Sequence, residues 1–235
     1  MLKLSAPTQL LDTVYEAILD AICNGTLAPE VRITQEGLAE TLGVSRQPIL
    51  QAIHLLKRQG FIADAGRKGV MVTPLDPKKL IDLYQIRAAL DALAARQAAN
   101  RFQHTPDAIE AAAGHALIAT GRQAILGQSM DDLILADMNF HQFIYSASGN
   151  GMITETTTLH WQHIRRAMGA ILSNNIRPRE RVWDEHEAIL DAILLGNAGL
   201  AETLARSHAE TAAERLAAVL TSAEYAAMRQ LAQTA

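Results

Sequence analysis

The stretch SRQPILQAIHLLKRQGFIAD, residues 45–64, has the pattern of an amphipathic helix followed by the beginning of a strand. Ile49 and Ile53 recur at helical spacing, and Gly60 follows as a helix stop. Ser45 stands where an N-cap residue would, because a serine hydroxyl can accept a hydrogen bond from an N–H of the first turn. The stretch therefore predicts a helix that packs one face on a core and exposes the other.

Two helices are predicted before this stretch, and two strands are predicted at its end and just beyond it. Apolar residues at helical spacing predict helices over residues 10–23 and 35–42. FIAD (61–64) and VMVT (70–73), joined by AGRKG, are typical of two strands around a tight turn. Three helices followed by a small hairpin are the outline of a winged helix-turn-helix. We expect this fold for residues 1–76.

Positive charge is concentrated within this predicted domain. The whole chain has a formal net charge of −4, so a nucleic-acid partner would need a local basic patch. The basic residues of the stretch 45–68 are Arg46, Lys57, Arg58, Arg67 and Lys68, and Asp64 is its one acidic residue. They fall on the third helix and on the turn between the strands, the two parts that would meet DNA. The pattern favours DNA contact over a merely solvated helix face and an ordinary basic turn.

The rest of the chain is predicted to be helical almost throughout. Hydrophobic periodicity and breaks at Gly, Asn and Pro predict helices over 78–103, 106–127, 131–148, 150–173, 179–195 and 198–221. An antiparallel bundle is the natural packing for such a series, and bundle cores often hold metal or ligand sites. The predicted fold class is therefore mostly α: a winged helix-turn-helix domain at 1–76 followed by an antiparallel all-helical domain at 77–235.

Composition limits the class of protein. The chain is 49% hydrophobic but only 4% aromatic, and no run of eighteen apolar residues occurs, so we expect no membrane-spanning helix. The single cysteine, Cys23, excludes an intramolecular disulfide and fits a reducing compartment. We therefore expect a cytoplasmic protein.

Four polar side chains of the helical part form two pairs. Asp137 and His141 lie four residues apart in ADMNFHQFIY, so one helical turn places them on the same face. His186 and His208 lie about equally far from the short GNAG turn between two consecutive predicted helices, so an antiparallel hairpin would bring them level. Three imidazoles and a carboxylate suit several divalent transition metals. Spacing alone does not bring the two pairs together, and a hydrogen-bonded polar core is an alternative.

The same segments resemble a known family of regulators. LAETLGVSRQPILQAIHLLKRQGFI (38–62) and the following GRKGVMV are similar to the N-terminal domain of GntR-type transcription regulators. IRAALDALAARQAA (86–99), DMNFHQFIYSASGN (137–150) and EHEAILDAILLGNAGLA (185–201) resemble the all-helical FCD effector domain of their FadR branch. The resemblance covers residues 10–222, and six effector-domain helices are closer to the VanR-like subgroup than to FadR itself.

The resemblance implies a metal site and an effector site in the helical domain. In many FCD domains an Asp and three His bind a divalent metal at the bottom of a cavity that takes a small organic acid. The matching residues are Asp137, His141, His186 and His208, and zinc, nickel and manganese are the expected metals. Arg87 matches a position commonly used for the effector carboxylate, although a salt bridge with Asp91 one turn on is the alternative. Arg165 and Arg166 are further candidates for lining the cavity.

The resemblance also implies DNA contacts, with two departures from the family pattern. The residues expected to contact DNA are Ser45, Arg46 and Gln47 on the third helix and Arg67, Lys68 and Gly69 in the wing. The family's third helix usually reads close to S-R-x-P-V-R-E-A, whereas Leu50 and Gln51 replace Arg and Glu here. Glu36 stands where relatives often carry a basic or neutral residue. These departures predict an altered operator or an altered affinity.

The sequence thus indicates a homodimeric regulator, with repression relieved by ligand as the commoner arrangement in relatives. Its partners would be a pseudo-palindromic double-stranded DNA operator and a small carboxylate effector. A metalloenzyme is the second hypothesis, but no further Glu, Cys or Ser stands in a motif for a general base or nucleophile, so we expect no enzyme activity. A regulator with a metal-free, purely structural polar cluster is the third.

Overall fold

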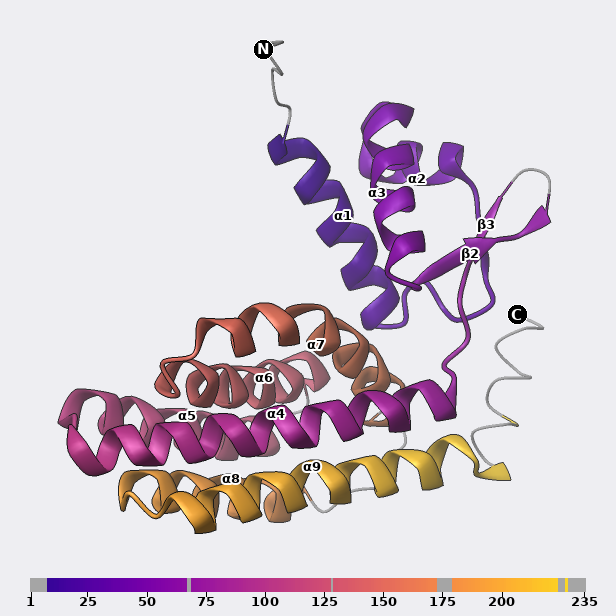
Figure 1. Ribbon diagram of the computed structural model, residues 1–235. Coiled ribbons are helices and arrows are strands. Elements are labelled where there is room, and N and C mark those ends of the chain that lie inside the picture. The colour runs from indigo at the N-terminus through magenta and orange to yellow at the C-terminus, as the bar shows by residue number, and fades with distance from the viewer. Residues whose placement is uncertain (1–7, 67–68, 128, 173–178, 224–226, 228–235) are drawn as a thin grey trace. The chain divides into compact units, whose positions relative to one another are not determined.

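The computed structural model describes residues 8–66, 69–127, 129–172, 179–223 and 227. It divides into two compact units, the first ending at Leu75 and the second beginning at Asp76 (Figure 1). The predicted fold class is confirmed: helices dominate, and a small helix-and-sheet unit precedes an all-helical one. Among the described residues, every helix is too short or too polar to span a membrane.

The first unit combines helices and a small antiparallel sheet. Its elements are α1 (Thr8–Cys23), β1 (Arg32–Ile33), α2 (Gln35–Leu42), α3 (Arg46–Arg58), β2 (Ile62–Asp64) and β3 (Val70–Val72). The strand order is β1-β3-β2, with Ile33 opposite Val70 and Ile62 opposite Val72. The hairpin was predicted; the two-residue strand β1, which widens the sheet, was not.

Local sequence sets the ends of α2 and α3. The Thr34 hydroxyl accepts a hydrogen bond from the Gly37 N–H at 3.1 Å and so caps α2. Gly43 ends α2 in the left-handed region, at φ 64°, which glycine adopts without strain. Ser45 is the N-cap residue of α3, but its side chain makes no capping hydrogen bond. Our expectation of a capping hydroxyl at Ser45 is therefore wrong, and this hydroxyl stays exposed on the surface.

The core of the first unit is a single apolar cluster. Its most deeply buried members include Ile18, Ile53, Leu56, Phe61 and Val72, each at most 1% exposed. Cys23 is buried in the same cluster. Burial of side chains of this size stabilises the unit by roughly 1.5–3 kcal/mol each. The cluster holds α3 against α1, so that the opposite face of α3 points outward.

The second unit is a helical bundle. Its helices are α4 (Pro77–His104), α5 (Ala108–Leu126), α6 (Met130–Ala147), α7 (Gly151–Leu172), α8 (Arg179–Leu194) and α9 (Ala198–Leu220). Asp76 and Asp107 cap α4 and α5 with carboxylates that accept N–H bonds of the first turn. α4 and α9 run antiparallel side by side along most of their length (Figure 1).

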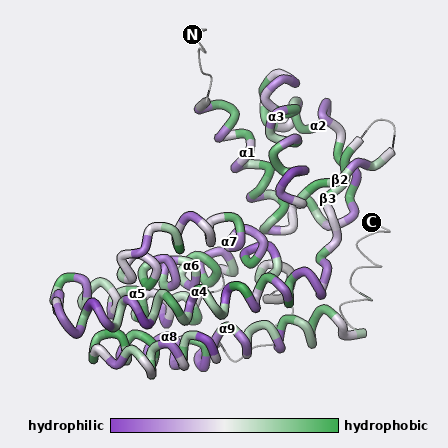
Figure 2. Tube along the Cα trace, viewed as in Figure 1, coloured by the Kyte–Doolittle hydropathy of each residue, from purple (hydrophilic) through white to green (hydrophobic). Residues whose placement is uncertain are grey.

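Small side chains let these helices approach closely. The buried face of α4 carries Ala88, Ala92, Ala95 and Ala99, and that of α9 carries Ala201, Ala205, Ala209 and Ala212. Apolar residues alternate with polar ones along the helices, as an inner and an outer face require (Figure 2). Larger buried side chains come from the other helices, such as Phe140 of α6, Trp161 of α7 and Trp183 of α8.

Candidate metal centre

Four polar side chains meet in the interior of the bundle. Asp137, His141, His186 and His208 each offer one ligand atom, and these atoms all lie within 4.8 Å of one another. All four residues are buried, at 6%, 2%, 0% and 4% exposure. The structure thus brings together the two pairs that sequence spacing left separate.

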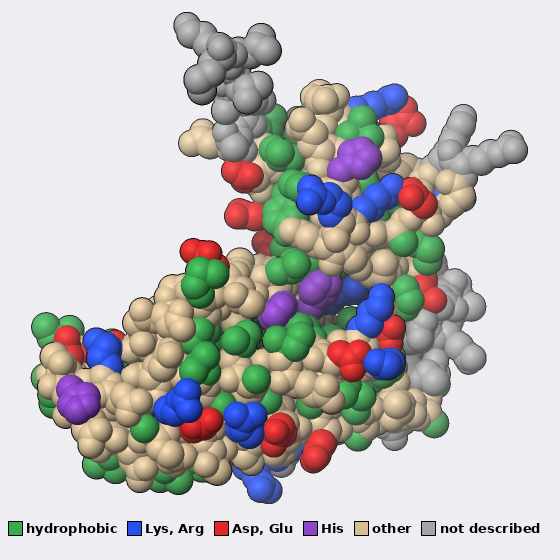
Figure 3. Space-filling view, viewed as in Figure 1, with side chains coloured by type: hydrophobic (Ala, Val, Ile, Leu, Met, Phe, Trp, Pro, Cys, Tyr) green, Lys and Arg blue, Asp and Glu red, His purple; other side chains and the backbone are tan. Residues whose placement is uncertain are grey.

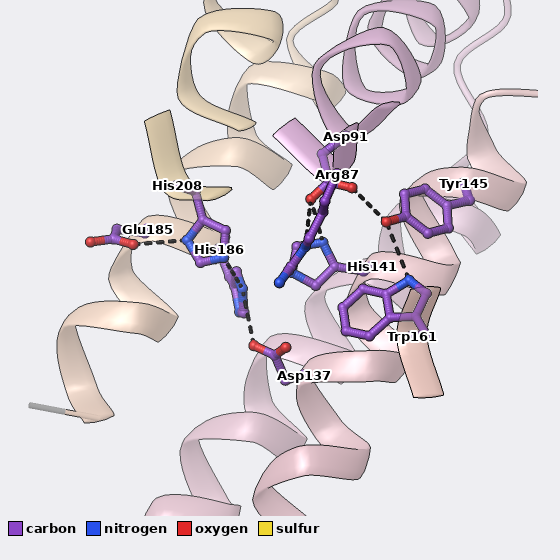
Figure 4. A network of polar contacts seen from close by, with 9 residues as sticks. All are labelled: Arg87, Asp91, Asp137, His141, Tyr145, Trp161, Glu185, His186 and His208. Atoms are coloured by element: carbon purple, nitrogen blue, oxygen red, sulfur yellow. Dashed lines mark hydrogen bonds and ion pairs between the residues drawn. The ribbon is translucent and has the colours of Figure 1, made fainter. Parts of the chain in front are cut away.

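Three helices supply these residues. Asp137 and His141 come from successive turns of α6, as their four-residue spacing predicted. His186 lies on α8 and His208 on α9, level with each other across the short connection between these helices (Figure 4). The other described histidines are more exposed: His54, His104 and His115 lie on the surface, and His160 and His163 are half-buried.

The spacing of the ligand atoms suits a metal ion. The Nε2 atoms of His186 and His208 are 3.2 Å apart, and His186 Nε2 lies 3.6 Å from Oδ1 of Asp137. Two ligands that each bind a zinc-like ion at about 2.1 Å in tetrahedral geometry are about 3.4 Å apart. These two separations bracket this value, so the contacts that His186 makes with His208 and Asp137 have the spacing of ligands that share a divalent ion.

Two carboxylates orient the imidazoles from outside the cluster. The Nδ1 atom of His208 lies 2.8 Å from Oε2 of Glu185, and Nδ1 of His141 lies 3.4 Å from Oδ2 of Asp91. A carboxylate accepts from an N–H, so it favours the tautomer that carries the proton on Nδ1 and leaves a lone pair on Nε2. Carboxylates commonly support metal-binding histidines in this way. The arrangement turns the basic nitrogen of His208 toward His186 and Asp137.

Arg87 borders the cluster on the α4 side. Its Nη2 lies 2.7 Å from Nε2 of His141, and its Nε donates to Oδ2 of Asp91 at 3.2 Å. The guanidinium also lies over the ring of Trp161, 4.6 Å from the ring centre. The predicted alternative for Arg87, an ion pair with Asp91, is therefore present. The contact with His141 also places Arg87 beside the proposed ligands.

A chain of hydrogen bonds continues from Asp91. The Tyr145 hydroxyl donates to Oδ1 of Asp91, and Nε1 of Trp161 donates to the Tyr145 oxygen at 3.3 Å (Figure 4). Burial raises the pKa of Asp91, and the neighbouring Arg87 opposes that rise. Burial, and then the charge of Asp91, raise the pKa of Tyr145 well above its usual value, so this phenol is a neutral donor at physiological pH.

The sequence reasoning missed three members of this network. Tyr145 follows His141 by one helical turn, Glu185 precedes His186, and Trp161 lies on α7. The i,i+4 spacing of His141 and Tyr145 was a usable signal, since it places both on one face of α6. No sequence signal places Trp161 there. Among the two further arginine candidates, Arg166 is buried at 5% exposure and Arg165 is half-buried.

The predicted DNA-contact residues lie on the first unit. Ser45, Arg46 and Gln47 are exposed at the N-terminal end of α3. Gly69 precedes β3 and lies against the side chain of Arg32, whose Nε would be 2.8 Å from a Cβ added at Gly69. Arg67 and Lys68 lie outside the described residues. The exposed start of α3 is where a winged helix presents its recognition residues.

Two family models match the chain, one for each unit. The model for "Bacterial regulatory proteins, gntR family" matches residues 10–72. The model for "FCD domain" matches residues 82–211, which is more than half of the 235 residues. The two matches occur in the order that the sequence resemblance implied.

Individual relatives agree with these matches. The chain is 28% identical over 200 residues to an uncharacterized HTH-type transcriptional regulator in an unstable DNA locus of Streptomyces ambofaciens, covering 83% of this chain and 80% of the other. It is 23% identical over 201 residues to the "Probable D-xylose utilization operon transcriptional repressor" of Paenarthrobacter nicotinovorans, covering 86% of each chain. The solved structure of E. coli McbR/YncC shares the fold, with a TM-score of 0.75 at 19% identity over 91% of this chain and 98% of that one. The Streptomyces and Paenarthrobacter relatives are named as a transcription regulator and a transcriptional repressor and not as enzymes, as expected for this chain.

Proposed function

The chain belongs to the FCD-domain family of GntR-type transcription regulators, and we propose that it is a dimeric repressor controlled by a divalent metal ion and a small organic acid. The observation that carries this proposal is the buried cluster of three histidines and one aspartate. In this proposal residues 1–76 bind DNA, and residues 77–235 bind the metal and the acid and form the dimer contact.

The chemistry of the cluster supports the metal. Three imidazole nitrogens, which are borderline donors, suit zinc and nickel, and one carboxylate oxygen, a harder donor, also suits manganese. When bound, such an ion supplies Lewis acidity and open positions for an oxygen ligand. Glu185 lies against Nδ1 of His208, and Asp91 lies against Nδ1 of His141, which favours a lone pair on Nε2 of each ring. In His141 this lone pair faces the Arg87 guanidinium, which a bound metal would have to replace.

The position of Arg87 supports a carboxylate effector. A guanidinium presents two parallel N–H donors that match the two oxygens of a carboxylate. Arg87 contacts His141, one of the proposed ligands, so an acid that reached the cluster would be within its reach. Such an acid would lose its hydrating water and would contact the metal ion on one side and the N–H donors of Arg87 on the other.

The exposed end of α3 supports the DNA partner. A dimer of winged helices would place two α3 helices in successive major grooves of a pseudo-palindromic operator. Arg46 would contact a guanine edge or a phosphate, with Ser45 and Gln47 beside it. The repressor role is supported by the Paenarthrobacter relative, whose printed name describes a repressor of an operon.

Metal content per chain tests the proposal most directly. The full chain would be purified without chelator or metal-affinity tag, and compared with His186→Ala, Asp137→Asn and the surface control His115→Ala. We expect about one metal ion per chain in the wild type and in the control, measured by elemental analysis. Either ligand variant should retain less than about a tenth of that content, because losing a ligand or its anionic charge weakens a four-ligand site strongly.

Two variants keep this test decisive. His186 is completely buried, so its truncation could impair folding, whereas Asp137→Asn keeps the shape of the side chain. Circular dichroism of each variant would establish that the helices are intact. Wild-type protein that stays metal-free after incubation with zinc, nickel and manganese would overturn the metal proposal. The cluster would then be a hydrogen-bonded polar core inside a DNA-binding protein.

A further inference from the structure

A polar hollow of about 560 Å³ lies in the first unit beside the proposed DNA-contact residues. It is bordered by the N-terminal end of α2, by α3, and by the hairpin strands. Four charged side chains are among those that line it: Glu36, Arg46, Lys57 and Asp64. Because Arg46 is proposed to contact DNA, the charge of this hollow bears on what the unit binds.

Among the residues that the structure describes, each cation that lines the hollow is paired with a carboxylate. Arg46 forms an ion pair with Glu36, and Lys57 forms one with Asp64. The side chains of Arg46 and Glu36 are 65% and 73% exposed, so this pair lies on the open surface. Acidic and basic side chains can be seen next to one another on this unit (Figure 3). The charges of these four side chains cancel.

Of the four charged residues, Glu36 is the one that affects which DNA groups Arg46 can bind. It is the second residue of α2, and its carboxylate reaches the guanidinium across the hollow. A phosphate oxygen that approaches Arg46 meets the repulsion of this carboxylate at every DNA sequence. A guanine edge is uncharged, and it offers O6 and N7 as two acceptors in the geometry of the guanidinium. The carboxylate therefore disfavours a phosphate more than it disfavours this base edge.

We propose that Glu36 is a specificity-determining residue of the DNA-contact surface, which suppresses generic phosphate binding by Arg46 while leaving its base contact available. This inference rests on the proposed DNA-binding function. Glu36 acts through Arg46, as a positioning residue, and does not need to touch the DNA. Its presence raises the ratio of operator affinity to affinity for unrelated DNA.

The test compares Glu36→Gln with the wild type on two DNA duplexes. One duplex would be selected by the full chain from a random-sequence library, and the other would be its scrambled version. Glu40→Gln is the matched control, because Glu40 is exposed one turn later on α2 and does not line the hollow. Affinity would be measured by fluorescence anisotropy over a series of salt concentrations.

We expect Glu36→Gln to tighten binding of the scrambled duplex by about threefold to tenfold, and of the selected duplex by less. The slope of log affinity against log salt on the scrambled duplex should steepen by up to about one, because one more phosphate is neutralised. Glu40→Gln should change both duplexes only slightly and to a similar extent. The second readout is a double-mutant cycle, in which Arg46→Ala should remove most of the effect of Glu36→Gln.

The possible outcomes separate this inference from the proposed function. Equal behaviour of Glu36→Gln and Glu40→Gln would overturn the inference, as would an effect that persists in the Arg46→Ala background. Weaker binding of the selected duplex alone would also overturn it, since Glu36 would then contact the DNA itself. Failure of the wild-type chain to select any duplex would instead overturn the proposed function.

Discussion

Gly121 of α5 is a position where a single added methyl group has no room. A Cβ built there would lie 2.0 Å from the indole ring of Trp183, and the residue itself is buried between α5 and α8. The Trp183 side chain is only 3% exposed, so it cannot swing into solvent. The backbone of Gly121 is helical, so any residue could adopt its conformation. Glycine is required here because Trp183 packs too closely for a side chain.

We predict that Gly121→Ala lowers the free energy of unfolding by about 1–3 kcal/mol, or more if Trp183 cannot repack. Urea unfolding followed by circular dichroism would measure the loss. Gly151→Ala is the matched control, because a Cβ added there meets nothing within 4 Å at the start of α7. Equal stability of the two variants would show that α5 and α8 do not pack as described.

The contact between α1 and the end of α3 has a consequence for stability at high pH. The hydroxyl of Tyr15 on α1 donates to Oε1 of Gln59, which follows α3, at 2.7 Å. Burial raises the pKa of Tyr15 above its ordinary value, so the fold favours the neutral phenol. The stabilisation is therefore complete below the unfolded pKa, near 10, and is lost as pH rises through the folded pKa.

We predict that Tyr15→Phe costs about 1 kcal/mol of unfolding free energy at pH 8, because one hydrogen bond is lost. The deficit relative to the wild type should shrink when the pH is raised above 10, since only the wild type carries this ionisable phenol. Chemical denaturation of both proteins at the two pH values would measure it. A deficit that is constant with pH would contradict the role given to Tyr15.

The arrangement of helices was largely predictable from the sequence, and the reason is local. Hydrophobic spacing and glycine breaks such as Gly43 and Gly196 act within a few residues, so α2 and α8 end within one residue of their predicted limits. Strand β1 was missed because two residues show no periodicity, and it exists only by pairing with β3. A capping bond was expected at Ser45 because a serine hydroxyl is able to make one. Whether it does depends on the side-chain rotamer, which the sequence does not fix.

The candidate centre was predictable only in part. The pairing of Asp137 with His141 follows from helix geometry, and that of His186 with His208 from a short hairpin. The meeting of the two pairs depends on how α6 packs against α8 and α9, which no local pattern fixes. The roles of Trp161 and Glu185 likewise depend on tertiary packing. Spacing grouped the four residues as a candidate set, and the family resemblance added the expectation that the two pairs meet.

In the proposed function, linkage between the ligands of the two units makes the molecule a regulator. If a small acid and an operator favour different conformations, each must weaken binding of the other by the same factor. Couplings of this kind are typically about 5-fold to 150-fold. The proposed function thus requires one coupling factor between acid binding in the second unit and operator binding in the first.

We predict that an acid that raises the melting temperature of the metal-loaded protein also weakens operator binding. The operator should weaken binding of that acid equally, as measured by titration calorimetry with and without the duplex. Arg87→Lys should bind the acid less tightly, because lysine keeps the charge but lacks the two-pronged donor geometry. An acid that binds the free and operator-bound protein with equal affinity would contradict the control proposed for it.

Both tryptophans of the chain lie against histidines of the candidate centre. The ring centre of Trp161 is 5.0 Å from that of His141, and the ring centre of Trp183 is 4.7 Å from that of His186. The first unit contains no tryptophan. Tryptophan fluorescence of the intact protein therefore originates beside these imidazoles, and it is an optical signal of events at the centre to which the first unit does not contribute.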